Sequence, residues 1–240
     1  MKQIDASGME YEALNRAVRA ADADVEICSC LGQRFIAAGL CDRKIIIHGV
    51  PGNALGAYLD GASVTVYGNA QDAVGDTMND GEIIIYGNAG DAPGYAMRGG
   101  RIYIKGDAGY RAGIHMKAYR EKQPVMIIGG TAGSFLGEYQ AGGTIIVLGL
   151  TEHTGNIVGN FPCTGMHGGK MFLRSDCSGV RFPEQVHANP ATKEDMSLIE
   201  EEVRAFCKCF GYAVKKVLDA PFTVITPDSK NPYKQMYVAN

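Results

Sequence analysis

The sequence predicts an all-β protein, a right-handed parallel β-helix with coils of about 19 residues and helical caps at both ends. One observation is a phrase of four or five β-favouring residues followed by glycine. The other is the composition, with 32 glycines among 240 residues and no tryptophan. A fixed period of this length is typical of stacked repeats, in which each period forms one supersecondary unit. The phrase ends at Gly49, Gly68, Gly87, Gly106, Gly129 and Gly149.

Each phrase is too short for a helix, so we interpret it as a strand closed by a glycine turn. The phrases follow one another at spacings of 19, 19, 19, 23 and 20 residues, which matches one coil per period. Because side chains alternate along a strand, the fourth and second residues before each glycine are expected to point inward and to stack. These pairs are Ile45/Ile47, Val64/Val66, Ile83/Ile85, Ile102/Ile104, Val125/Ile127 and Ile145/Val147.

The alternate strand positions face outward and are too apolar for open water. We expect this ridge to be covered, by the chain's own terminal segments in preference to a partner. It comprises Ile46, Thr65, Ile84, Tyr103, Met126 and Ile146, with His48, Tyr67, Tyr86, Lys105, Ile128 and Leu148 beside them.

The flanking segments divide the chain into three parts: an N-terminal helix and capping coil (1–40), the repeat domain (41–180), and a C-terminal helix with an extended tail (181–240). Residues 10–23 are expected to form an amphipathic helix, and residues 25–38 an imperfect first coil. Residues 116–123 are a polar insertion of about four residues in the fourth unit, which places them in a loop.

The C-terminal part begins with Thr192, which is expected to cap a helix together with Asp195. Residues 222–225 are expected to be extended and residues 231–240 irregular. One apolar helical stripe is predicted from Met196, Ile199, Val203, Phe206, Phe210 and Val214, and it should pack back on the rod.

Charge and targeting signals narrow the function classes. A net charge of −3 and a pI near 6.0 argue against sequence-independent nucleic-acid binding. The sequence has no signal-peptide pattern and no apolar window long enough for a bilayer, so a soluble, cytoplasmic protein is expected, without membrane partners. Seven scattered cysteines suit a reducing compartment.

Candidate chemistry is sparse, and we predict no catalytic, cofactor-binding or metal-binding residues. The pairs Cys28/Cys30 and Cys207/Cys209 lack redox or zinc spacing, which favours packed thiols. The nearest approach to a nucleophilic site is Cys163 between two histidines, which would bring a thiol beside an imidazole. The histidines are otherwise dispersed, at His48, His115, His153, His167 and His187.

Two further patterns allow a structural and a functional interpretation. Asp72, Asp91 and Asp107 recur about one coil apart and would stack as a carboxylate ladder, able to bind a cation or a polysaccharide. Each of them follows a turn, however, where aspartate is a normal local cap. The phrases GNALG and GDAGYRAG resemble phosphate loops, but no GxxxxGK[ST] is present and their glycines belong to the repeat.

Several ordered phrases resemble the carboxy-terminal β-helical domain of the glutamate synthase large subunit. They are the GNAxDA repeats, GEYQAGGTIIVLG at 137–149 and GNFPCTGMHGGK at 159–170, with LNRAV at 14–18 resembling the segment that leads into that domain. The same glycine-repeat domain occurs in the β-helical component of formylmethanofuran dehydrogenase.

The resemblance implies a non-catalytic scaffold subunit of a split glutamate synthase. Its partners would be a glutaminase (class II amidotransferase) subunit and a flavin-dependent synthase subunit, which would carry FMN and an iron–sulphur cluster. The chain begins with Met1 and lacks a clustered three-cysteine motif, so neither half-reaction is expected here. The alternative is the β-helical component of a formylmethanofuran dehydrogenase-type complex. A homo-oligomer, and an autonomous enzyme or carbohydrate-binding β-helix acting through the aspartates, also stay open.

Overall fold

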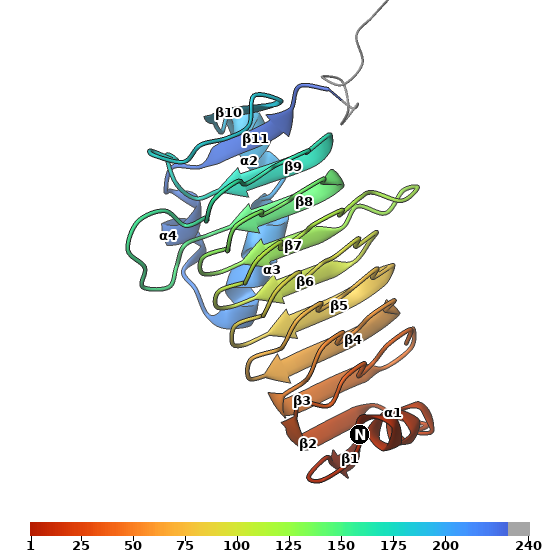
Figure 1. The fold of residues 1–240 in the computed structure, drawn as a ribbon. Helices are drawn as coiled ribbons and strands as arrows, with labels where there is room; N and C mark the ends of the chain where they lie inside the picture. The colour runs from red at the N-terminus through yellow and green to blue at the C-terminus, as the bar shows by residue number, and fades with distance from the viewer. Residues whose placement is uncertain (230–240) are drawn as a thin grey trace, which may run out of the picture.

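The computed structural model describes residues 1–229, and its strands form one 11-stranded sheet. Nine strands stack in sequence order as parallel neighbours, so each coil adds one rung to the stack (Figure 1). They are β1 (Lys2–Asp5), β2 (Val25–Leu31), β3 (Lys44–Val50), β4 (Asp60–Tyr67), β5 (Asp80–Ile85), β6 (Arg101–Ile104), β7 (Val125–Ile128), β8 (Ala141–Val147) and β9 (Gly168–Leu173). The parallel β-helix is therefore confirmed.

The core is a column of aliphatic side chains along the axis of the stack. Ile45 pairs with Val64, Val64 with Ile83 and Ile83 with Ile102, in the register that the 19-residue period predicts. All four side chains are fully buried. Since each fully buried aliphatic side chain contributes about 1.5–3 kcal/mol, this column is the main favourable term of the fold.

The predicted inward pair of the β7 coil is wrong by one residue. Ile102 pairs with Met126 and Ile104 with Ile128, so Met126 and Ile128 point inward, while Val125 and Ile127 face outward. The phrase VMIIGG ends in two glycines, and the second is the one in register: the Gly130 N–H donates to Gly106 O, and the Gly149 N–H to Gly130 O. Because side chains alternate along a strand, a shift of one residue in the register exchanges the inward and outward side chains.

The turns opposite the sheet also hydrogen-bond from coil to coil. The Ala54 N–H donates to Asp72 O of the next coil, whereas the Gly56 N–H donates to Ile36 O of the preceding one. Positive φ at Ala54, Gly56 and Tyr58 produces this alternation. The glycine at the centre of the turn is required for space as well, because a Cβ on Gly75 (φ +65°) would lie 2.5 Å from Ile102 Cδ1 inside the core.

Helix α1 (Tyr11–Arg19) lies across the N-terminal end of the stack (Figure 1). Its side chains replace a missing coil: Asn15 Nδ2 donates to Arg34 O at 2.8 Å, and Arg19 donates to Ala38 O at 2.6 Å. Both carbonyls belong to the first coil, and their equivalents higher in the stack accept N–H groups from the coil below. The N-terminal cap is thus a hydrogen-bonded one, which the sequence did not reveal.

The C-terminal stripe forms three short helices in place of the single predicted one: α2 (Lys193–Ser197), α3 (Glu200–Phe210) and α4 (Val214–Leu218). Thr192 and Asp195 form the predicted capping box. Gly211, in a left-handed conformation (φ +76°), ends α3 and turns the chain back.

Two strands close the C-terminal end of the sheet. The segment expected to be extended is β11 (Thr223–Pro227), which pairs antiparallel with β9 and with β10 (Val186–Pro190). Neither β10 nor β1 was predicted. The expected irregular tail, 231–240, lies outside the described residues. Within residues 1–229 no helix is long and apolar enough to cross a membrane.

Candidate functional site

The outward face of the sheet is covered by the chain itself over its C-terminal half. Phe206 of α3 is fully buried, and its ring lies 5.9 Å from that of Tyr103 on β6. The covering also includes Ile199, Val203, Cys207, Val217, Phe222 and Val224, packed on Ile127, Ile146, Leu148 and Phe172. The expected self-covering is therefore confirmed for this half of the ridge.

A buried polar contact fixes α3 to the sheet. The Tyr103 hydroxyl, on a residue that is 1% exposed, donates to Glu202 Oε2 at 2.5 Å. Arg101 Nε donates to both oxygens of the same carboxylate, at 2.9 and 3.0 Å. Burial, and next the bond to Glu202, raise the pKa of Tyr103. The phenol consequently stays a hydrogen-bond donor throughout the physiological range.

The N-terminal half of the same face lacks such a covering within the described residues. From the end of α3, aromatic rings contact one another from coil to coil. Tyr86 meets Phe210 of α3 edge-on at 5.0 Å, the tilted Tyr67 ring lies 4.8 Å from that of Tyr86, and His48 stacks on Tyr67 at 5.3 Å. Tyr67 is 46% exposed. This aromatic column therefore joins the covered half of the face to the open half.

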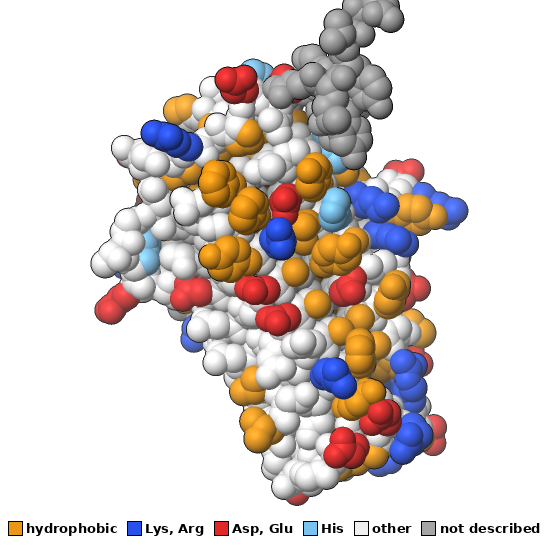
Figure 2. All heavy atoms as spheres, viewed as in Figure 1, with side chains coloured by type: hydrophobic (Ala, Val, Ile, Leu, Met, Phe, Trp, Pro, Cys, Tyr) orange, Lys and Arg blue, Asp and Glu red, His pale blue; other side chains and the backbone are white. Residues whose placement is uncertain are grey.

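A second aromatic surface lies on the turns of the later coils. The Phe135 and Phe161 rings stack at 5.3 Å, the Arg111 guanidinium lies over Phe135, and His115 stacks on Tyr139 at 5.2 Å. All five residues have positive φ, and Arg111, Phe135 and Phe161 stand where Ala54, Ala73 and Ala92 stand in earlier coils. Figure 2 shows hydrophobic side chains gathered on this part of the molecule around isolated charged ones. Aromatic and arginine side chains are enriched at protein interfaces.

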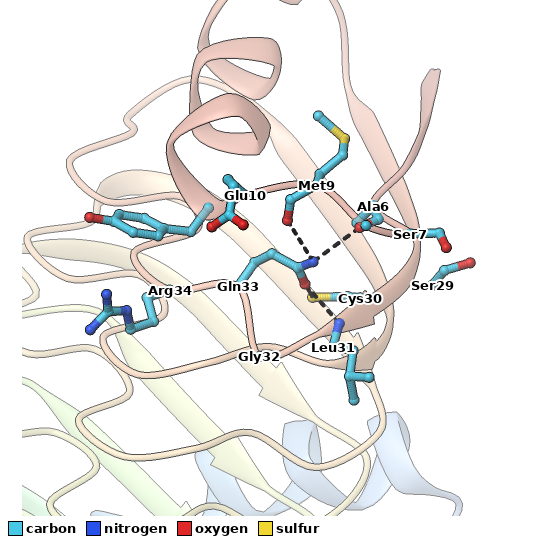
Figure 3. Close-up of a pocket in the computed structure, with 12 residues that line it drawn as sticks. Ala6, Ser7, Met9, Glu10, Ser29, Cys30, Leu31, Gly32, Gln33 and Arg34 are labelled. Carbon is cyan, nitrogen blue, oxygen red and sulfur yellow. Dashed lines mark hydrogen bonds between the residues drawn. The ribbon is translucent and has the colours of Figure 1, made fainter.

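An open cleft of about 800 Å³ lies at the N-terminal end, between residues 6–11 and 29–34 (Figure 3). Gln33 points into its wall and is almost wholly buried. Its amide donates to Ala6 O and Met9 O, at 3.0 and 3.1 Å, and accepts from the Leu31 N–H at 2.7 Å. The amide thus ties the N-terminal segment to the first coil, which is a structural role.

The predicted carboxylate ladder is wrong in its membership. Asp72 Oδ1 accepts the Asp91 N–H, and Asp91 Oδ1 accepts the Tyr110 N–H, both at 2.8 Å. Asp107 belongs to a separate ladder, in which it follows Asn88 and accepts from the Thr131 N–H at 2.7 Å. Each carboxylate accepts a backbone N–H of the next coil, so its role is structural, but the cap joins neighbouring coils and is not local to one turn as predicted.

The thiol and imidazole groups suggested for nucleophilic chemistry are directed elsewhere. Cys163 is fully buried against Met171, with 3.6 Å between the sulphurs, and burial raises the pKa of its thiol to about 12. His153 and His167 each direct Nδ1 to a nearby backbone carbonyl. A thiol with so high a pKa is not a nucleophile at neutral pH.

The other singled-out residues have structural surroundings. Cys30 and Cys207 are buried, and Cys28 and Cys209 half-buried, as expected for packed thiols. His48 contacts Glu26 at 3.0 Å, and His187 lies on β10. Across residues 1–229 no group of three His, Cys, Asp or Glu side chains is placed to hold a metal ion.

Sequence reasoning missed the residues that build these surfaces. From the sequence, Glu202, Asn15 and Arg19 are indistinguishable from ordinary helix surface, because each bonds a partner outside its own helix: Glu202 a strand 99 residues away, and Asn15 and Arg19 carbonyls of the first coil. The aromatic turn surface had a detectable signal: Arg111, Phe135 and Phe161 occupy the turn position that is alanine at 54, 73 and 92.

Comparison with known proteins agrees with this architecture. A family model described as the GXGXG motif matches residues 6–228. An uncharacterized protein of Methanocaldococcus jannaschii is 42% identical over 248 aligned residues, which cover 98% of this chain and 95% of the relative. A chain of the formyltransferase/hydrolase complex FhcABCD from Methylorubrum extorquens, solved with methylofuran, has a TM-score of 0.68 at 22% identity and covers 95% of this chain and 91% of that chain. That last likeness shows a shared fold. By the match over almost its whole length, the chain belongs to the GXGXG motif family, as does the carboxy-terminal domain of glutamate synthase.

Proposed function

We propose that this protein is a non-catalytic scaffold subunit of a multi-subunit enzyme complex. The observation that carries the proposal is the half-covered outer face of the sheet: the chain's own helices pack over β5 to β9, while the aromatic column at His48 and Tyr67 continues into the open half. Exposed aromatic and apolar surface of this kind is typical of a site on which another chain packs. Seven unpaired cysteines support a reducing, cytoplasmic location.

One form of the proposal is a split glutamate synthase. Membership of the GXGXG motif family, together with the ordered phrases at 137–149 and 159–170, supports it. Both phrases lie in the last two coils, where they supply β8 and the turn before β9. In this form a glutaminase subunit and a flavin-dependent synthase subunit bind the rod, and FMN and an iron–sulphur cluster reside on those partners.

The second form is a subunit of a formyl-transfer complex related to formylmethanofuran dehydrogenase. The structural likeness to a chain of FhcABCD supports it, since 91% of that chain is covered by this one. The comparison favours this form at least as strongly as the first, because the matched FhcABCD chain shares this fold over most of its length and is part of a multi-subunit complex.

Purification of the tagged full-length protein from its native source tests the proposal. We expect a stable complex whose partners, identified by mass spectrometry, separate the two forms. A class II amidotransferase and a flavoprotein with bound iron would support the glutamate synthase form. Molybdenum or tungsten with formyl-transfer subunits would support the second. A monodisperse, partner-free protein would contradict both.

A further inference from the structure

An inserted hairpin, residues 117–123, projects between β6 and β7 from the edge of the rod at which the strands begin (Figure 1). Tyr119 and Lys122 exchange backbone hydrogen bonds across it, both of 3.1 Å. The hairpin packs against bare backbone on both sides: a Cβ on Gly99 would lie 3.1 Å from the Lys122 side chain, and a Cβ on Gly142 would lie 2.3 Å from a hairpin nitrogen. The neighbouring coils therefore hold the hairpin in one position.

The carboxylates beside the hairpin are already engaged by one of its lysines. Lys122 Nζ lies 2.8 Å from Asp80 Oδ2 and 3.7 Å from Asp60 Oδ1. These aspartates begin β5 and β4, so the lysine reaches down the rod over two coils. The other cations of this edge consequently have no carboxylate left to pair with.

Two of these cations, Arg98 and Lys117, stand one above the other at the base of the hairpin. Their N–H groups donate to equivalent carbonyls in successive coils, Met78 O and Met97 O, so their side chains are about one coil spacing, ~4.8 Å, apart. Arg98 is half-buried, and its Nε is buried without a hydrogen-bond partner. Neither residue forms an ion pair within residues 1–229. Since neighbouring like charges repel and an unpaired buried donor is costly, the two are suited to an anionic occupant.

The tip of the hairpin adds an aromatic ring and another unpaired cation. Tyr119 is 47% exposed, and the Arg120 guanidinium carbon lies 5.3 Å from the centre of its ring. Arg120 and the adjacent Glu121 are exposed, and neither has an ion-pair partner in the part of the chain that the structure describes. Figure 2 shows Lys and Arg side chains gathered at this edge, on a chain whose net charge is −3. Tyrosine and arginine are both enriched at protein interfaces.

A cleft of about 570 Å³ adjoins the hairpin on the side of the later coils. Ala118 and Gln123 of the hairpin form one wall. Ala141 follows Lys117 in the same column, since its N–H donates to Met116 O of the hairpin's own coil, and its small side chain leaves the cleft open next to Lys117. An extended peptide would fit over the floor, because the floor has no side chains. It consists of Gly142, Gly143, Gly168 and Gly169.

The charges favour an acidic polypeptide as the occupant. Residues 230–240 contain no Asp or Glu, so this chain's own C-terminal segment lacks the carboxylate side chains that the site requires. A nucleic acid carries a phosphate at every step and follows long basic surfaces. Here Glu121 and the two aspartates beside Lys122 flank the cations and would repel such a backbone.

We propose that the edge formed by Arg98, Lys117 and Arg120 binds an acidic segment of a partner subunit, which lies in the glycine-floored cleft and places carboxylates on these cations. The inference rests on the scaffold function proposed above and names a surface that serves it. Charged pairs at the rim of an interface govern partner choice and salt dependence. Retention of the partner should therefore fall as the salt concentration rises.

Charge-changing variants of the full-length protein test the surface in the co-purified complex. Lys117→Glu combined with Arg120→Glu should weaken retention of the partner on the order of tenfold, because both exposed cations become groups that repel it. Glu121→Gln should strengthen retention by about twofold, because it removes the acid among the cations. Lys208→Glu is the matched control: this lysine is exposed on α3, and its reversal should leave retention unchanged. Circular dichroism of each variant confirms that the rod is folded.

Lysine chemistry gives a readout that does not depend on variants. Acetylation of Lys117 should fall several-fold in the complex relative to the isolated protein, whereas that of Lys208 should not. Carbodiimide coupling of the complex should join Lys117 Nζ to an Asp or Glu carboxylate of the partner, as an amide formed with loss of water. Peptide mapping of the coupled product then identifies the acidic segment.

The outcomes separate this surface from the scaffold function. A complex that tolerates Lys117→Glu with Arg120→Glu, and in which Lys117 is still acetylated, would overturn the surface and leave the scaffold function standing. Coupling of Lys117 to a second copy of this chain would overturn the proposal in favour of self-association, and loss of the complex on nuclease treatment would overturn it in favour of a nucleic acid. Failure to form any complex would remove both proposals.

Discussion

The contact between Tyr103 and Glu202 is the one most open to a quantitative test, because it is buried and fixes α3 to the sheet. Glu202→Leu removes the acceptor of the Tyr103 hydroxyl, on a residue only 1% exposed. A buried donor without a partner costs about 1–3 kcal/mol. The Arg101 side chain is 51% exposed and can return to water, so it adds little. We expect Glu202→Leu to lower the free energy of unfolding by about 2–3 kcal/mol.

A double-mutant cycle isolates the contact. Tyr103→Phe removes the hydroxyl that Glu202→Leu strands, so the double variant should be less destabilised than the sum of the single changes by at least about 1 kcal/mol. Urea unfolding, followed by far-ultraviolet circular dichroism and by tyrosine fluorescence, measures each value; coincidence of the two curves establishes that the transition is two-state. Single-variant costs that add to within about 0.5 kcal/mol would refute the reasoning.

The matched control is the exposed pair on the same helix. Arg204 donates to Glu200 Oε1 at 2.6 Å with both side chains about half exposed. Glu200→Leu should therefore change the free energy of unfolding by no more than about 0.5 kcal/mol. A cost as large as that of Glu202→Leu would show that helix propensity, and not the buried contact, determines both results.

Three further outcomes follow from burial and backbone geometry. Gly75→Ala should destabilise the rod by about 2–4 kcal/mol in urea unfolding, because Gly75 has φ +65° and the new Cβ would lie 2.5 Å from a methyl group of the core. Gly155→Ala should cost only about 1 kcal/mol, because Gly155 has φ +88° but open space around it. Equal costs would contradict the packing argument. In thiol labelling of the native protein near neutral pH, exposed Cys41 should react fast and Cys163, buried with a pKa of about 12, only on unfolding; rapid labelling of Cys163 would refute its burial. Because burial raises the pKa of Tyr103, the folded state keeps the phenol proton above pH 10, the ordinary tyrosine pKa being about 10, whereas the unfolded state loses it. The free energy of unfolding, measured with urea, should therefore fall as the pH rises above about 10, and more steeply than in Tyr103→Phe. Equal slopes would contradict the shift.

The local features of the fold were predictable because they repeat. The period of 19 residues placed Ile45, Val64 and Ile83 in one column, and the structure pairs them so. Where the period was broken, the prediction failed: the double glycine after β7 moved the inward pair by one residue to Met126 and Ile128. Periodicity fixes a face only while the register is unambiguous.

The ladder of aspartates shows a different limit. Asp107 is 16 residues from Asp91 and not 19, so it falls in the column of Asn88. The distances in sequence contain this information, and strict counting by the period would have separated the two ladders. Turn chemistry predicted a cap local to each turn. The stacking of coils instead gives each carboxylate a backbone N–H of the next coil.

By itself the sequence determined the solenoid, its inward columns, the turn chemistry and the helix start at Thr192, because each depends on contacts at a fixed separation along the chain. Only the tertiary structure decided how the ends are closed and how far α3 covers the sheet. Asn15 and Arg19 bond carbonyls 19 residues away, at the spacing of the period, but they do so with helix side chains in place of the backbone N–H groups of a coil. The bond of Tyr103 to Glu202 joins residues 99 apart and follows no period. The open face begins at β5 because Gly211 ends α3 there and turns the chain back. The sequence shows where the helix ends, but only the tertiary structure shows which strand that end lies against.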